Sequence, residues 1–297
     1  MARMSLVAVL MGACVSKLVA GCDVTHPDYG AVGDGMNDDT SSIQAVLDDP
    51  KCPEVLFPAG KKFKAGSLHL TRSNVVLTLE NDSELEGDEK HIKQCDDEAD
   101  WRGWCSFFTV DSAENVTIRG NGTLAGGGKQ GQHWSTLHIR STVGVDMGGG
   151  GTRIYCTNSW WCTVMHNASN VYIHELFIDG SKGRDGLDLV NSREILIENS
   201  RIEGSDDGLC FKTQADSGLS EWIAESVYVR DSYLSSHCCN AIQFGSRTEV
   251  DMLVLFGRFC FFSLISSLRF LFGCFESLVC CMHPKMQDIF GQLSITC

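Results

Sequence analysis

The sequence predicts an all-β fold, a parallel β-helix with a short helical cap at its N-terminal end. Short segments that alternate apolar and polar residues recur along the chain, as in strands with one buried face. In addition, Asp185-Gly186-Leu187 recurs as Asp207-Gly208-Leu209, 22 residues later, a plausible length for one turn of a solenoid. A β-sandwich would need hairpin turns, and only Gly120-Asn121-Gly122 resembles one.

The N-terminal part is expected to precede and cap the stack. Residues 1–20 are predicted to be a secretory signal, because an apolar segment follows Arg3 and ends in small residues. In the cap, Thr40–Leu47 is predicted as a helix with Thr40 as its N-cap. The apolar face of this helix consists of Ile43, Val46 and Leu47.

The strands of the repeat follow at uneven intervals. Val171 and Ile195 occupy equivalent positions 24 residues apart, whereas Ile195 and Val227 are 32 apart. Loops of different length therefore leave successive turns, as they do in a β-helix. We expect the repeat to occupy residues 21–248 and to be incomplete there. The clearest strands are predicted at 74–79, 115–118, 170–173, 194–197 and 226–229.

The segment 249–297 has a different character. It contains 8 of the 15 phenylalanines and 5 of the 15 cysteines, and no repeat is visible in it. Arg258 and Arg269 interrupt its apolar part, which argues against a membrane span. We interpret this tail as aberrant sequence, from a translated intron or a shifted reading frame, that lies outside the repeat and replaces its remaining turns.

Cysteines and glycosylation sequons indicate the secretory route. Fifteen cysteines in 297 residues fit disulfides in an oxidising compartment, with the pairing left open. The absence of any Cys-x-x-Cys spacing argues against zinc. We therefore expect a secreted, extracellular glycoprotein that needs no metal and no other cofactor. The sequons begin at Asn81, Asn115, Asn121 and Asn167.

Three carboxylates stand out within the repeat. When the two copies are aligned, Asp185 falls on Asp207, and Asp206 lies beside them. Stacked turns hold equivalent residues about 4.8 Å apart, so these side chains are expected to cluster on one exposed face. Clustered carboxylates cost electrostatic energy, and a fold that keeps them is predicted to use them. The structural alternative is a strand-ending turn in which Asp206 and Asp207 bond to backbone amides.

These segments resemble the polygalacturonase-like glycoside hydrolases of family 28, whose fold is a right-handed parallel β-helix. Asp185 matches the Asp of the family's Asn-Thr-Asp motif, and Asp206-Asp207 match its Gly-Asp-Asp motif. Asp28–Thr40 resembles the opening of the same superfamily. The resemblance covers residues 28–248. Because the family's later Gly-His-Gly and Arg-Ile-Lys motifs are missing, we expect a C-terminally truncated member.

The resemblance implies a glycosidase that cleaves pectin-type polysaccharide with inversion of configuration. Asp206 would be the general acid that protonates the leaving oxygen, while Asp185 and Asp207 would share the activation of water. Two neighbouring anions would raise the proton affinity of Asp206, as an acid requires.

Further residues near the carboxylates are candidates for substrate binding. Asn240 stands where the family has its His, and His237, three residues upstream, is out of register. Lys212 and Arg184 are the nearest cations for a substrate carboxylate, and for Arg184 a solvated surface charge is an equal alternative. Trp160-Trp161 resembles a family position before the catalytic turns, where core packing is the expected role.

The net charge of −14 disfavours nucleic acid and anionic membrane surfaces as partners. We expect a monomer that acts on a polysaccharide. Two other classes remain open. A calcium-dependent polysaccharide lyase on the same fold would use the carboxylates as metal ligands, but it would also need an Arg or Lys base. An inactive, carbohydrate-binding homologue would explain the missing His and basic motif.

Overall fold

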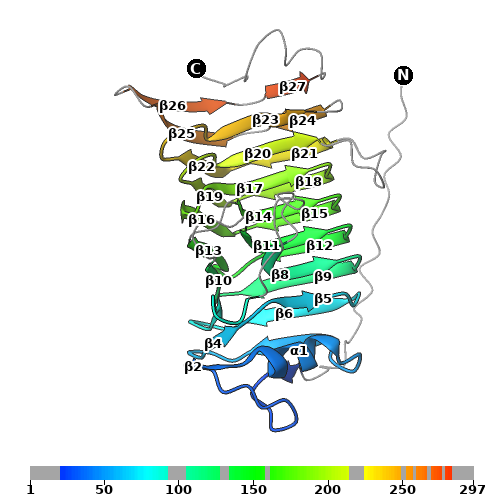
Figure 1. Cartoon of the computed structure of the whole chain (residues 1–297). Coiled ribbons are helices and arrows are strands. Elements are labelled where there is room, and N and C mark those ends of the chain that lie inside the picture. Colours follow the sequence, from blue (N-terminus) through cyan, green and yellow to red (C-terminus); the bar gives the residue numbers. More distant parts are fainter. Residues whose placement is uncertain are drawn as a thin grey trace, which may run out of the picture.

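The computed structural model describes residues 21–92, 105–127, 134–157, 161–213, 224–248, 252–256, 259–265, 269–275 and 278–282. Within these ranges the chain winds into a right-handed parallel β-helix, a stack of turns that runs from the helix α1 to the C-terminal strands (Figure 1). The fold class predicted from the sequence is therefore confirmed.

Successive turns contribute strands to three sheets, which we name A, B and C. Sheet A contains, in spatial order, β1 (Cys22–Asp23), β3 (Glu54–Phe57), β6 (Val75–Leu79), β9 (Glu114–Gly120), β12 (Val143–Gly148), β15 (Ser169–His174), β18 (Arg193–Glu198), β21 (Ala224–Arg230), β24 (Met252–Phe256) and β27 (Leu278–Met282). Sheet B contains β2 (Asp34–Asp38), β4 (Lys62–Ala65), β7 (Glu84–Gly87), β10 (Thr123–Gly127), β13 (Arg153–Thr157), β16 (Phe177–Lys182), β19 (Arg201–Gly204), β22 (Ser232–Ser236), β25 (Phe259–Ile265) and β26 (Arg269–Phe275). Sheet C contains β23 (Ile242–Thr248), β20 (Leu209–Thr213), β17 (Asp185–Val190), β14 (Trp161–His166), β11 (Trp134–Arg140), β8 (Cys105–Asp111) and β5 (Leu68–Leu70).

The uneven intervals of the sequence repeat do not disturb the register of sheet A. Val171 aligns with Ile195, and Ile195 aligns with Val227, so the extra residues of the longer turn lie outside the strands. The residue before each of these three has a left-handed backbone, with φ between 54° and 55°. One of them is Asn170, and asparagine tolerates this conformation better than most residues. The polar residue that opens each predicted strand is therefore a corner of the coil.

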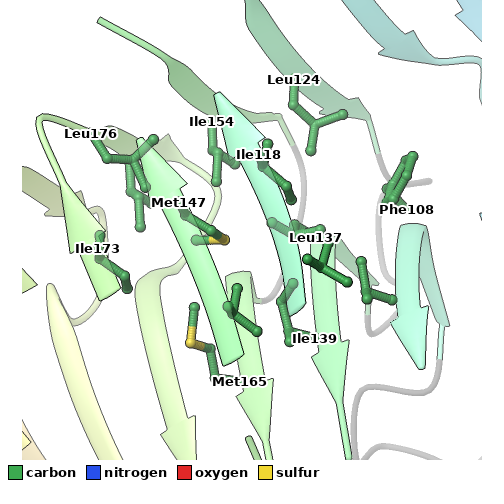
Figure 2. Packing of buried hydrophobic residues seen from close by; sticks show 14 of the residues in the cluster. Phe108, Ile118, Leu124, Leu137, Ile139, Met147, Ile154, Met165, Ile173 and Leu176 are labelled. Carbon is green, nitrogen blue, oxygen red and sulfur yellow. The ribbon is translucent and has the colours of Figure 1, made fainter. Parts of the chain in front are cut away.

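Ladders of inward-facing side chains fill the interior (Figure 2). Ile118, Met147 and Ile173 are aligned partners on three consecutive strands of sheet A, and Leu137 and Phe108 are aligned on sheet C. Burial of one such side chain contributes roughly 1.5–3 kcal/mol. Because each turn contributes a layer of these side chains, the hydrophobic core extends along the stack of turns.

The cap contains the single helix of the described ranges, α1 (Thr40–Asp48), and its buried residues are Ile43, Val46 and Leu47, as predicted. The predicted N-cap, Thr40, is wrong by one residue, because Asp39 occupies that position. The hydroxyl oxygen of Thr40 instead accepts a hydrogen bond from the backbone N–H of Gly66 at 2.6 Å. Asp39 makes no side-chain cap bond, because its carboxylate accepts the N–H groups of Val32 and Gly33.

Two disulfides occur in the described part of the chain. Cys22–Cys52 joins β1 to the segment between α1 and β3, and Cys156–Cys162 joins β13 to β14. Of the four sequon asparagines, Asn167 is buried, while the other three are exposed. Among the described residues, no helix has the length and apolar character needed to cross a membrane.

Strand pairing continues beyond Thr248, where we expected the repeat to end. β24 and β25 pair in parallel with β21 and β22, and β27 and β26 then pair antiparallel with β24 and β25. Phe, Val and Leu are abundant in these strands, and such residues favour extended structure next to a strand edge. The parallel order of the coil therefore ends at β24 and β25 within the described strands. The origin of this tail stays a prediction.

Candidate active site

Two of the three carboxylates predicted from the sequence, Asp185 and Asp207, meet at the end of sheet C where its strands begin, and Asp206 lies on the same turn as Asp207. Asp185 opens β17, and Asp207 lies two residues before β20, on the next turn. The backbone N–H of Asp207 donates to Asp185 Oδ1 at 3.4 Å. In the same direction, the backbone N–H of Asn240 donates to Asp207 Oδ1 at 3.0 Å. Asp185, Asp207 and Asn240 therefore stand one above another on consecutive turns.

Asp206 contacts Arg184 across one turn. Its Oδ2 lies 2.8 Å from Nη2 of Arg184 and accepts a hydrogen bond from Nε at 3.1 Å. Both side chains are partly exposed. This pairing places a cation directly beside the residue that the resemblance makes the general acid.

Lys212 was predicted to bind substrate, but the structure buries its ammonium group among carboxylates. Its Nζ lies 2.9 Å from Asp185 Oδ2 and also contacts Asp188 Oδ1, and only 4 % of its side chain is exposed. The ring centroid of Trp161 lies 4.4 Å from the same Nζ, a distance typical of a cation–π contact. Lys212 is therefore the internal counter-ion of Asp185 and Asp188.

The charges around Lys212 decide its protonation. Burial alone would lower the pKa of this lysine, but the nearby carboxylates of Asp188 and Asp185 outweigh burial and raise the pKa well above its usual value. The ammonium form therefore persists at neutral pH.

Whereas the surroundings of Lys212 favour its charged form, those of Asp207 favour its neutral, protonated form. Burial raises the pKa of its carboxyl to about 6, and the negative charges of Asp185 and Asp206 add to this effect. The backbone N–H of Asn240 and the charge of Lys212 lower the pKa but do not cancel the shift. Asp207 thus titrates in the mildly acidic range, where a carboxyl group can exchange protons during catalysis.

Glycines allow the two turns to approach closely enough for this arrangement. A Cβ added to Gly204 would lie 1.8 Å from the backbone oxygen of Asp207, and one added to Gly186 would lie 2.7 Å from that of Gly208. Real Cβ atoms do not make contacts this short. The glycine just before the Asp pair is therefore required for close backbone approach.

The remaining predicted residues take different positions. His237 is exposed, and its backbone N–H donates to the carbonyl of Gly204 at 3.1 Å. Asn240 donates a hydrogen bond from its side-chain amide to Oε1 of Gln243, three residues further along the chain on β23. The expectation that all three carboxylates lie on an exposed face is wrong for Asp185, which is only 6 % exposed, because the cluster packs around Lys212.

Asp188 is a charged residue near the site that the sequence prediction missed. It is fully buried, and its signal in the sequence is a charge within the apolar run Leu187–Val190. A buried charge needs a partner. The partner cannot be read from strand alignment alone, because Asp188 aligns with Cys210 while Val190 aligns with Lys212. The contact is therefore diagonal, between positions two residues apart in register.

In the part of the chain that the structure describes, two groups of side chains each bring three potential metal ligands within 4.8 Å of one another. One is Asp185, Asp207 and Cys210, and the other is Asp206, Cys238 and Cys239. The first group offers carboxylate oxygens from only two residues, and the ammonium of Lys212 already contacts Asp185. This argues against the calcium ladder of the lyase alternative, because Ca²⁺ takes six to eight oxygen ligands.

Comparisons with known proteins agree with the geometry. The chain is 26% identical to an exopolygalacturonase of Cochliobolus carbonum over 61% of this chain and 44% of that protein. It is 24% identical to exopolygalacturonase X-1 of Emericella nidulans over 68% of this chain and 49% of that protein. The chain thus spans about half the length of these curated relatives. No family model matches.

Solved structures of the same fold include two with related names. The family 28 exopolygalacturonase of Yersinia enterocolitica matches with a TM-score of 0.62 and 18% identity, over 76% of this chain and 50% of that one. The polygalacturonase of Erwinia carotovora matches with a TM-score of 0.56 and 19% identity, over 82% of this chain and 68% of that one. In sequence the chain is similar to these exopolygalacturonases, and in fold it is similar to the solved polygalacturonases.

Proposed function

We propose that the protein is a secreted glycoside hydrolase that cleaves pectin-type polysaccharide with inversion of configuration. The observation that carries this proposal is the contact between Asp185 and Asp207 on consecutive turns, with Asp206 next to Asp207 in the chain and the ammonium of Lys212 buried against Asp185. The curated relatives named exopolygalacturonase support the reaction class and the substrate class.

The roles follow from the contacts. Asp185, which contacts the ammonium of Lys212, and Asp207 on the next turn orient and deprotonate a water molecule. Asp206 is adjacent in sequence to Asp207, so its side chain projects differently from the Asp185–Asp207 pair. Asp206 donates a proton to the glycosidic oxygen, while water attacks the opposite face of the sugar. Binding of the sugar must exchange the contact between Arg184 and Asp206 for contacts with substrate, which frees Arg184 for a substrate carboxylate.

Asn240 separates this site from a complete family site. It stands on the ladder next to Asp207, but an amide cannot exchange a proton in the way a His can. Its backbone N–H still stabilises the ionised form of Asp207. An inactive homologue that only binds carbohydrate is therefore the second candidate function, and a lyase is the third.

The products of the reaction distinguish these functions. The full chain is incubated with polygalacturonate, and new reducing ends are followed by proton NMR while ultraviolet absorbance is recorded. The proposal predicts new reducing ends whose first-formed anomer is inverted relative to the bond cleaved, without an unsaturated product. Retained configuration would contradict the mechanism, an ultraviolet-absorbing product would indicate a lyase, and binding without cleavage would indicate an inactive homologue.

A further inference from the structure

Two adjacent cysteines lie against the turn that carries Asp206. Cys238 and Cys239 follow β22, and the backbone N–H of Cys238 donates to the carbonyl of Ser205 at 3.2 Å. The hydroxyl of Ser236 donates to the backbone carbonyl of Asp206 and accepts the N–H of Cys239, the latter at 2.8 Å. Hydrogen bonds thus fix both cysteines relative to Asp206.

The side chains of these residues converge. The two sulfur atoms are 3.2 Å apart, and neither cysteine forms a disulfide. Both sulfurs and a carboxylate oxygen of Asp206 lie within 4.8 Å of one another. Cys238 is exposed, whereas Cys239 is half-buried, so the group is open to solvent on one side only.

The cluster concentrates three acidic groups in a partly buried place. Arg184 is the cation that contacts Asp206, and its contacts are to Oδ2. A divalent cation that displaces the two thiol protons would compensate the remaining negative charge.

We propose that Cys238, Cys239 and Asp206 form a binding site for a soft divalent cation of the zinc and cadmium class. The two sulfurs and one carboxylate oxygen would be its protein ligands, with water at the fourth position. Zinc prefers four ligands drawn from Cys, His and carboxylate groups, and thiolates select soft metals over calcium or magnesium. The spacing of the cysteines gave no sign of this site, because the third ligand comes from the neighbouring turn.

The site has a consequence for catalysis, and this consequence rests on the proposed function. A metal ion bound to Asp206 removes its carboxyl from proton donation, so micromolar zinc or cadmium is expected to inhibit the enzyme reversibly. Metal binding itself does not depend on Asp206 being catalytic. The two claims can therefore fail separately.

Cadmium titration tests the binding claim directly. The full chain, purified without reductant under anaerobic conditions, is titrated with Cd²⁺ while the ultraviolet thiolate-to-cadmium charge-transfer band and the bound metal are measured. The double variant Cys238→Ser, Cys239→Ser is expected to bind one equivalent less than the unmodified chain. Asp206→Asn should keep the charge-transfer band with weaker binding. Cys210→Ser, which changes a buried free thiol outside the cluster, is the matched control and should bind as the unmodified chain does.

Several outcomes would overturn the proposal. Equal cadmium uptake by the double variant and the unmodified chain would place the metal elsewhere. A Cys238–Cys239 disulfide found by mass spectrometry in the purified protein would remove the ligands. If zinc lowers turnover of the unmodified chain and of the double variant equally, inhibition does not act through this site. If the chain proves inactive on polygalacturonate, the cadmium count still decides the binding claim while the proposed function fails.

Discussion

Sheets A and C are wound from the same turns, yet they differ in what their outward positions contain. In sheet A, strands such as β15 and β18 alternate buried residues with partly or fully exposed ones. In sheet C, all six residues of β17 and all five of β20 are buried, including Asp188 and Lys212. The alternating strands of sheet A serve the packing of the coil. The buried charges of sheet C break this alternation, and such local departures from the packing pattern are expected at functional sites.

The buried charges of sheet C and the apolar side chains of sheet A also contribute differently to stability. A buried ion pair rarely stabilises a fold more than well-packed apolar residues of similar volume, but removal of one partner is costly. The cluster of Lys212 with Asp185 and Asp188 is therefore weak evidence for stability and stronger evidence for a site that needs defined charges. Substitutions in the two sheets should separate these contributions.

The largest effect is expected from Lys212→Met. This change leaves Asp185 and Asp188 buried without their counter-ion, which should lower the free energy of unfolding by about 3–5 kcal/mol. The control is Lys62→Met, which breaks the exposed pair with Glu84 and should have no measurable effect. Urea denaturation measures both. Equal stability of the two variants would show that the buried cluster does not depend on its lysine.

A change in the regular ladder of sheet A should cost somewhat less. Ile195→Ala removes a fully buried side chain that packs between Val171 and Val227, so we expect a loss of roughly 2–4 kcal/mol. Leu196→Ala, at the next and partly exposed position of the same strand, should change stability by less than about 1 kcal/mol. Denaturation midpoints of the two variants check this, and a larger loss for Leu196→Ala would contradict the assignment of faces.

The smallest effect is a pH-dependent gain in stability for Asp207→Asn. The carboxyl titrates near pH 6 in the folded protein and near 3.8 in the unfolded chain. The folded protein therefore holds an extra proton between these values, and stability falls as the pH rises through them. Replacement by Asn removes this penalty, which should stabilise the protein at pH 7 by about 1–2 kcal/mol, allowing for partial solvent screening. The gain should vanish below pH 4, and a gain that persists there would refute the shifted pKa.

Much of the fold could be predicted because its signals are local. Alternation of apolar and polar residues defines the strands. The repeat aligns Asp185 with Asp207, 22 residues later, and in the structure these two residues form a hydrogen bond between consecutive turns. The helix of the cap was found from its apolar face, but its N-cap is Asp39 and not Thr40. The hydroxyl of Thr40 instead accepts the backbone N–H of Gly66, which lies 26 residues away.

The interior of the site could not be predicted because its contacts cross turns. Lys212 reaches Asp188 diagonally, so alignment of the repeats does not pair them. Cys239 approaches Asp206 through a bond to Ser236 that depends on the path of the loop after β22. Charge and residue type identified the carboxylates, while the fold decides which of them share a cation.

The most direct test of the central claim is the turnover of Asp206→Asn on polygalacturonate, with substrate binding measured on the same preparation by calorimetry. Asp146→Asn is the matched control, since this carboxylate lies on sheet A beside His174. We expect a loss of turnover of about 10²–10⁴-fold for Asp206→Asn, with substrate affinity and the denaturation midpoint unchanged, and full activity for the control. Turnover retained by Asp206→Asn would contradict its role as the general acid.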